Sequence, residues 1–177
     1  SNDYFSTTVD CTVAVAHTTL SCVAAGGIGA DVEWTISVGG QTSPKVSGLS
    51  SFGLPDIESI TTLEPFDTTG GVRFTVDGTN FGDDIVHLRL SYGPVTGMEY
   101  VTSCSYDIAH TRLSCLSSAG VGKNLKFKIV VAAQESVLKS TNIDYKTPVV
   151  GALAGSGTSY AATEGGDVVY ITGSQFG

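Results

Sequence analysis

The sequence has little charge, and positive charge is the scarcest. Its 177 residues include 9 Lys and Arg against 17 Asp and Glu, which gives a net charge of −8. Charged residues make up 15% of the chain, whereas about 25% is usual for soluble domains. The few cationic residues are scattered, without a basic run or stripe. Because nucleic-acid binding needs clustered Lys and Arg, we expect no nucleic-acid partner.

Three further patterns are missing from the sequence. No apolar run approaches the roughly 20 residues of a membrane-spanning helix, so we expect no membrane insertion in this segment. There is no Asn-x-Ser/Thr sequon, so N-linked glycans are not expected, although the abundant Ser and Thr leave O-linked glycans open as partners. No Gly-x-Ser-x-Gly nucleophile elbow occurs either.

Alternation of apolar and polar residues at period two predicts β-strands, and the 22 glycines favour many turns. Each strand is expected to bury one face and expose the other, as in an antiparallel β-sandwich. We therefore predict an all-β fold without a helix of ten or more residues. Trp34 and Phe127 are expected to be core residues of corresponding strands. The predicted core faces are Val32, Trp34, Ile36 and Val38; Val72, Phe74 and Val76; Val86, Leu88, Leu90 and Tyr92; and Leu125, Phe127, Ile129 and Val131.

The chain aligns with itself. Residues 11–57 match residues 104–150 at a constant offset of 93 without a gap, and residues 70–82 match residues 165–177 at an offset of 95. The alignment predicts the C-terminal part of a first repeat at 1–54, a complete repeat at 55–147 and the N-terminal part of a following repeat at 148–177. Because half a sandwich would expose its apolar face, we expect the segment to belong to a longer array.

The four cysteines recur with the repeat as Cys-x10-Cys. The identical spacing favours the pairs Cys11–Cys22 and Cys104–Cys115, each closing a hairpin whose turn contains a histidine. Disulfides indicate an oxidising compartment, hence secretion or the cell surface. Reduced thiols and a Cys/His zinc site are the alternatives, although zinc usually requires four ligands and a Cys knuckle, which the repeat lacks.

Several short motifs recur at defined places in the complete repeat. They are Pro55-Asp-Ile57, Gly70-Gly71, Gly78-Thr-Asn-Phe81-Gly82, Cys104 with Cys115, Ala119-Gly-Val-Gly122, and Tyr145 with Pro148. This set resembles the IPT/TIG domain, the immunoglobulin-like domain of plexins, Met-type receptors and some transcription factors. The resemblance covers essentially the whole chain and implies tandem early-set immunoglobulin-like antiparallel β-sandwich repeats. Within that family, the chain is similar to large secreted surface or flagellar-hair (mastigoneme) proteins of algae and other protists.

These observations predict a non-enzymatic extracellular structural or adhesive protein, in the form of a rod or filament on a cell surface or flagellar appendage. The linkers before Pro55 and Pro148 are short, and proline stiffens each of them. Expected partners are other repeats of the same protein, through self-association, or other extracellular proteins. The alternative is the ectodomain stalk or ligand-binding module of a cell-surface receptor.

No catalytic residue, cofactor or metal ion is predicted. His17 and His110 occupy the same position of the two hairpins, which indicates a turn or packing role, and His87 has no counterpart in the repeat. Glu58 and Glu64 have no matching carboxylate partner for glycoside hydrolysis. Asp67 and Asp83-Asp84 are interpreted as solvated acidic turns, with interdomain calcium as the alternative.

Overall fold

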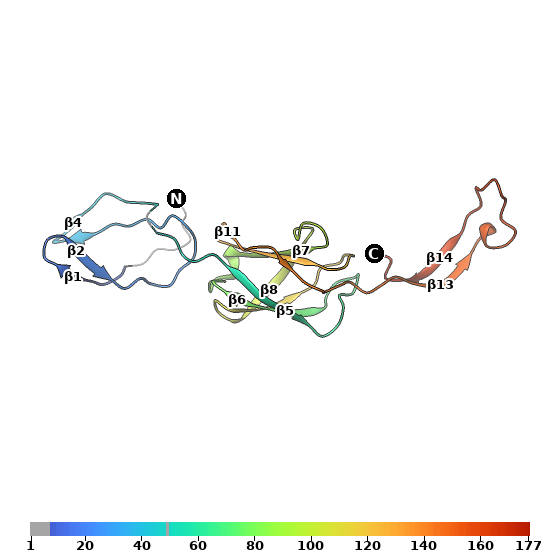
Figure 1. Ribbon diagram of the computed structural model, residues 1–177, viewed down its shortest axis with the longest axis horizontal. Helices are drawn as coiled ribbons and strands as arrows, with labels where there is room; N and C mark the ends of the chain where they lie inside the picture. The colour runs from blue at the N-terminus through green and yellow to red at the C-terminus, as the bar shows by residue number, and fades with distance from the viewer. Residues whose placement is uncertain (1–7, 49) are drawn as a thin grey trace.

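The computed structural model describes residues 8–48 and 50–177, and these residues fold almost entirely into antiparallel β-strands. The predicted all-β class is thus confirmed. Figure 1 shows an elongated molecule of three parts placed end to end. We call residues 8–54 the N-terminal part, residues 55–147 the middle part and residues 148–177 the C-terminal part.

The middle part is a β-sandwich whose two sheets share one strand. The first sheet has the strand order β5-β6-β9-β8, and the second has the order β8-β7-β10 with two short strands, β11 and β12, paired to β10. Residues 100–102 of β8 pair with β7, and its later residues pair with β9. The strands are β5 (Asp56–Thr62), β6 (Arg73–Thr79), β7 (Leu88–Gly93), β8 (Tyr100–Ile108), β9 (Arg112–Leu116), β10 (Lys126–Val131), β11 (Gln134–Glu135) and β12 (Lys139–Ser140).

Aromatic rings fill the space between the two sheets. Tyr92 of β7 stacks on Phe127 of β10 with 5.0 Å between ring centroids, and Phe74 of β6 contacts Phe127 edge-on at 5.8 Å. The Tyr92 and Tyr145 hydroxyl oxygens lie 2.9 Å apart, and burial raises the pKa of the Tyr145 hydroxyl. The predicted core face of β10 is confirmed, because Leu125, Phe127, Ile129 and Val131 are all buried.

The predicted strand beginning at Val86 is wrong at its start. Residues Ile85–His87 form a short 3-10 helix, η1, and β7 begins at Leu88. The Asp84 side chain accepts a hydrogen bond from the Val86 backbone N–H at 3.0 Å and thereby caps η1. This local side-chain bond stabilises a helical turn against the extended conformation that the alternation predicts. Val86 is consequently 80% exposed.

The two outer parts are hairpins that, among the described residues, pair only within themselves. Trp34 was expected in the core, and this is wrong: it is 36% exposed, whereas Phe127 is 0% exposed. No second sheet covers the face of Trp34 within residues 8–48 and 50–54. The strands are β1 (Cys11–Val15), β2 (Thr19–Cys22), β3 (Ser37–Val38), β4 (Gln41–Thr42), β13 (Val149–Ala154) and β14 (Tyr170–Ser174), and η2 (Ser156–Thr158) is a 3-10 turn.

Both disulfides that the recurring spacing favours are present. Cys11 is joined to Cys22 across β1 and β2, and Cys104 is joined to Cys115 across β8 and β9. The histidine of each intervening turn has a positive φ, 66° at His17 and 67° at His110. The two hairpins therefore share both their covalent link and their turn conformation.

Candidate functional site at the two junctions

The candidate chemical residues do not converge on one place. His17 and His110 lie in turns of different parts, His87 lies in η1, Glu58 lies on β5 and Glu64 pairs with Lys146. Within residues 8–48 and 50–177, no group of three or more His, Cys, Asp or Glu side chains could hold a metal ion. The same residues contain no helix long and apolar enough to cross a membrane. Because these side chains are dispersed, we take the contacts between the three parts as the candidate functional site.

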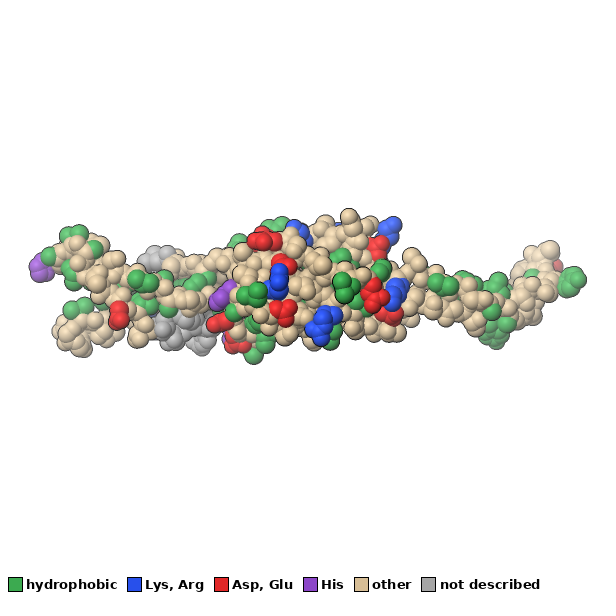
Figure 2. All heavy atoms as spheres, turned by 90° about the horizontal axis from the view of Figure 1, so that it is seen from below, with side chains coloured by type: hydrophobic (Ala, Val, Ile, Leu, Met, Phe, Trp, Pro, Cys, Tyr) green, Lys and Arg blue, Asp and Glu red, His purple; other side chains and the backbone are tan. Residues whose placement is uncertain are grey.

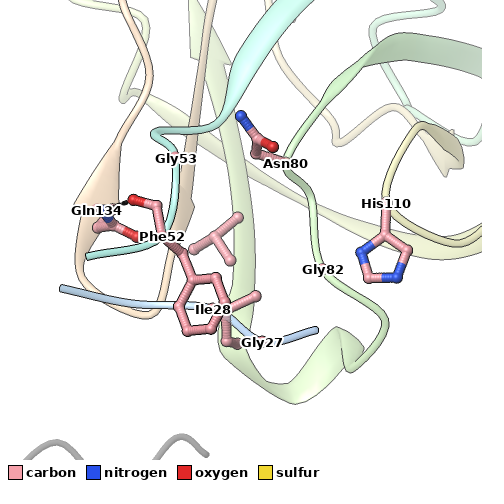
Figure 3. Close-up of a pocket in the computed structure, with 9 residues that line it drawn as sticks. Gly27, Ile28, Phe52, Gly53, Asn80, Gly82, His110 and Gln134 are labelled. Carbon is pink, nitrogen blue, oxygen red and sulfur yellow. Dashed lines mark hydrogen bonds between the residues drawn. The ribbon is translucent and has the colours of Figure 1, made fainter. Parts of the chain in front are cut away.

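Junction 1, between the N-terminal and middle parts, is held by the side-chain amide of Gln134. Its Oε1 accepts a hydrogen bond from the Gly29 backbone N–H at 3.1 Å, and its Nε2 donates to the Phe52 carbonyl oxygen at 3.0 Å. Figure 3 shows Gln134 reaching the backbone at Phe52. Gln134 is buried, so both ends of its amide are satisfied by the neighbouring part, as a buried amide requires.

An apolar contact accompanies this amide at junction 1. Ile28 of the N-terminal part packs against the core of the middle part. It lies over Gly82, where a Cβ atom would come within 2.7 Å of the Ile28 Cγ2. Gly82 also has a φ of +74°, so both its conformation and the lack of space favour glycine. Asn80 adds a hydrogen bond from its Nδ2 to the Leu54 carbonyl at 2.9 Å.

The remaining cavity at junction 1 is small. It measures about 60 Å³ and is lined by residues of both parts, including Ile28, Phe52, His110 and Gln134 (Figure 3). Sites for drug-sized ligands are usually about 300 to 1,000 Å³. Junction 1 is therefore a packed contact between two parts of the chain, and its free space suits only a few water molecules.

Junction 2, between the middle and C-terminal parts, is held by Gln175. Its Oε1 accepts hydrogen bonds from the backbone N–H and the hydroxyl of Thr68, at 3.0 and 2.9 Å. Its Nε2 donates to the Asp67 carboxylate at 3.2 Å. As at junction 1, one glutamine amide uses both its donor and its acceptor across the contact.

A small ionic network surrounds the Asp67 carboxylate at junction 2. The ammonium of Lys146 lies 3.2 Å from Asp67 Oδ2 and 3.3 Å from Glu64 Oε2. Hydrogen bonds from the Thr69 backbone N–H and hydroxyl, followed by those from Lys146 and Gln175, hold the pKa of Asp67 well below its ordinary value of 3.8. Asp67, a candidate for a solvated acidic turn, thus has a defined role in orienting Gln175.

The charge on Asp67 should persist in acid. Because the pKa is lowered in the folded chain, the ionised carboxylate stabilises junction 2 above the ordinary Asp pKa, and this stabilisation is lost only as the pH falls through the lowered value. In an NMR titration, we expect the midpoint of Asp67 to lie well below the ordinary Asp value of 3.8. A Gln175→Ala variant removes one donor and should raise that midpoint. A midpoint near 3.8 in the original chain would contradict the network.

Positions that the sequence alignment makes equivalent have similar geometry at the two junctions. Val121, the counterpart of Ile28, lies over Gly177, where a Cβ atom would come within 3.0 Å of Val121 Cγ1. The φ angles of Asn80 and its counterpart Gln175 are 60° and 61°. The polar contacts differ, since Asn80 donates to the linker carbonyl of Leu54, whereas Gln175 reaches Asp67 and Thr68.

A shallow groove of about 470 Å³ also lies at junction 2, lined by residues that include Pro65, Tyr145, Lys146, Val149 and Gln175. Its size falls in the range of small-molecule sites, but it is broad and open to solvent.

Comparison with known proteins assigns no family to this chain. A scan against protein-family models finds no match, and a search of curated proteins likewise finds none. The resemblance to the IPT/TIG domain consequently remains an expectation from the motifs.

Proposed function

We propose that this chain is a segment of a non-enzymatic extracellular structural or adhesive protein, built from tandem immunoglobulin-like repeats that form a rod or filament. The observation that carries the proposal is the recurrence at both junctions of the same apolar contact, Ile28 on Gly82 and Val121 on Gly177. Because the same contact recurs with the sequence repeat, each repeat is held at a similar orientation to the one before it. The array therefore extends in one direction.

The physical chemistry of the junctions favours stiffness. Each junction combines a glutamine amide that bonds across the contact with an aliphatic side chain that closes over a glycine. The linker residues Phe52 and Leu54 are themselves hydrogen-bonded through their carbonyl groups to Gln134 and Asn80. Bending at junction 1 would break these bonds and expose Ile28 to water, and both effects oppose it.

The two disulfides and the low charge support an extracellular location. Partners would be further repeats of the same protein, through self-association, or other extracellular proteins. The stalk of a cell-surface receptor is the competing role. It would use the same stiff junctions, so the presence of a ligand-binding partner, and not the shape of the rod, distinguishes the two roles.

Small-angle X-ray scattering of the dilute chain tests the rod. We expect a single elongated shape with a narrow range of maximum dimensions. Gln134→Leu removes both hydrogen bonds of the junction 1 amide and should broaden that range, because the N-terminal part then pivots about its linker. Gln41→Leu is the matched control, since Gln41 occupies the equivalent position on the exposed β3–β4 hairpin. A flexible profile for the original chain would overturn the proposal.

A further inference from the structure

The first and last segments of the middle part are joined by a parallel contact. The Phe66 N–H donates to the Asp144 carbonyl at 2.9 Å, and the Lys146 N–H donates to the Phe66 carbonyl at 2.8 Å. These bonds pair Phe66 with Tyr145, and the two segments run in the same direction. All other strand pairings among the described residues are antiparallel. We call this contact, between residues 64–68 and residues 144–146, the parallel bridge.

Side chains strengthen the parallel bridge. The rings of Phe66 and Tyr145 are buried and contact each other edge-on, with 5.7 Å between their centroids. The Lys146 ammonium lies 3.2 Å from the Asp67 carboxylate and 3.3 Å from that of Glu64, so it reaches residues on both sides of Phe66 in the chain. Figure 2 shows acidic and basic side chains together at the end of the middle part that meets the C-terminal part. The bridge thus combines backbone bonds, a buried ring contact and an ionic network.

The position of the parallel bridge along the chain decides what load it takes. The chain enters the middle part at Pro55 and continues through β5 into residues 64–68, whereas residues 144–146 lead out into the C-terminal part. Figure 1 shows β5 beginning beside the N-terminal part and the chain leaving at the opposite end. Tension along the molecule therefore pulls residues 64–68 back through β5 and residues 144–146 forward. The shortest path for this load crosses the parallel bridge and bypasses β6 to β12.

The common direction of the two segments determines how they separate. Because they are pulled from opposite ends, the force acts along them, and the two backbone bonds and the Lys146 contacts share it. These contacts must therefore break in one step. Two segments pulled from the same end separate more easily, since their bonds are loaded and broken one after another. The arrangement in the middle part slows separation under tension, and the rate of this step governs forced unfolding.

The C-terminal part is attached to the same segment. Gln175 accepts hydrogen bonds from the Thr68 N–H and hydroxyl and donates to the Asp67 carboxylate. The Asp67 Oδ2 atom accepts from both Gln175 and Lys146, which joins junction 2 to the parallel bridge. Sliding of residues 144–146 past residues 64–68 would carry the C-terminal part along and would break the Gln175 bonds as well.

We propose that the parallel bridge is a mechanical clamp, through which tension passes along the rod from one part to the next without loading the core. The inference rests on the proposed function, because a rod or filament transmits such tension. Contacts that break in the rate-limiting step raise the barrier to unfolding, whereas contacts that break later do not. Lys146 should consequently affect forced unfolding more than ion pairs elsewhere in the middle part do.

Magnetic tweezers at constant tension, with handles on the two ends of the full chain, test the role of Lys146. The middle part is recognised by its extension step, the largest of the three. Lys146→Met removes both ion contacts and keeps the two backbone bonds, so the middle part should unfold about fivefold faster. Lys128→Met is the matched control, since it breaks the Lys128–Glu135 ion pair between β10 and β11, away from the load path.

The control should change the rate of forced unfolding by less than about twofold, because its contact breaks after the parallel bridge. Equal acceleration by Lys146→Met and Lys128→Met would show that the bridge carries no special load, and would overturn the inference.

The direction of pulling provides a second test. Arg73→Cys, at the exposed start of β6, places a handle on the C-terminal side of residues 64–68. Pulling between this handle and the C-terminal end separates the two segments of the bridge from the same end, so their bonds break in turn. At equal tension we expect unfolding at least about tenfold faster than when the same variant is pulled from its two ends. Equal rates in the two directions would contradict the clamp.

Small-angle scattering without tension separates this inference from the proposed function. Lys146→Met should keep the shape distribution of the original chain, because Gln175 retains its hydrogen bonds to Thr68. A rod whose rate of forced unfolding does not depend on pulling direction refutes the clamp alone, whereas a flexible original chain refutes the proposed function.

Discussion

Replacing Phe127 by Ala should lower the free energy of unfolding of the middle part by about 3–5 kcal/mol, the usual cost of deleting a buried aromatic ring. Phe127 is fully buried and stacks on Tyr92, while Phe74 contacts it edge-on. Removing the ring leaves a cavity between the two sheets that β7 and β6 cannot close, because both are fixed in hydrogen-bonded ladders.

Trp34→Ala is the control, since Trp34 aligns with Phe127 but lies in the N-terminal part. It should change the unfolding of the middle part by less than about 0.5 kcal/mol, as expected of distant sites. Urea unfolding followed by the near-ultraviolet circular dichroism of the tyrosines measures both variants, because Tyr92, Tyr100 and Tyr145 lie together in that core. Similar losses for the two variants would show that Trp34 and Phe127 share one cooperative core.

The fold class could be predicted because its signal is local. Alternation at 125–131 specifies which face of β10 is buried, and the recurring cysteine spacing selects the two hairpin disulfides. The same pattern at 32–38 gave the wrong burial for Trp34, because burial depends on a second sheet that the local pattern does not contain. Val86 was misplaced for a different reason, namely the cap that Asp84 provides to η1.

The junctions were harder to foresee, because their contacts join residues far apart in sequence. Gln134 bonds Gly29 across 105 residues, and Gln175 bonds Asp67 across 108. The self-alignment did contain one useful signal, the identity of Gln41 and Gln134. A glutamine present at the same position of both repeats indicates a specific partner, but only the structure shows that the partner of Gln134 is the backbone of the neighbouring part.

The structure gives a physical role to the motif Gly78-Thr-Asn-Phe81-Gly82, one of those that resemble the IPT/TIG domain. Phe81 is fully buried. The left-handed conformations occur at Asn80 and Gly82, with φ of 60° and 74°. Gly78 lies in regular strand β6, and it is needed because a side chain there would meet the Asp56 carbonyl oxygen and the Phe81 ring.

Gly78→Ala should therefore destabilise the middle part by about 3 kcal/mol, the upper end of the usual cost of overpacking. The added Cβ would lie 2.5 Å from Phe81 Cζ and even closer to the Asp56 carbonyl oxygen. Relief requires β5 to separate from β6 or Phe81 to leave the core, and displacement of Phe81 would disturb junction 1 as well. Asn80 and Gly82, which hold that junction, flank Phe81 in the chain.

Gly26→Ala provides the matched control for this change. Gly26 has open space around its Cα and no positive φ, so its substitution should alter stability by less than about 0.5 kcal/mol. Thermal unfolding and small-angle scattering of both variants measure the two consequences. If Gly78→Ala is destabilised but keeps the elongated shape of the original chain, Phe81 has stayed in place and β5 has moved. If the shape distribution broadens too, the end of β6 positions the N-terminal part as well as closing the core.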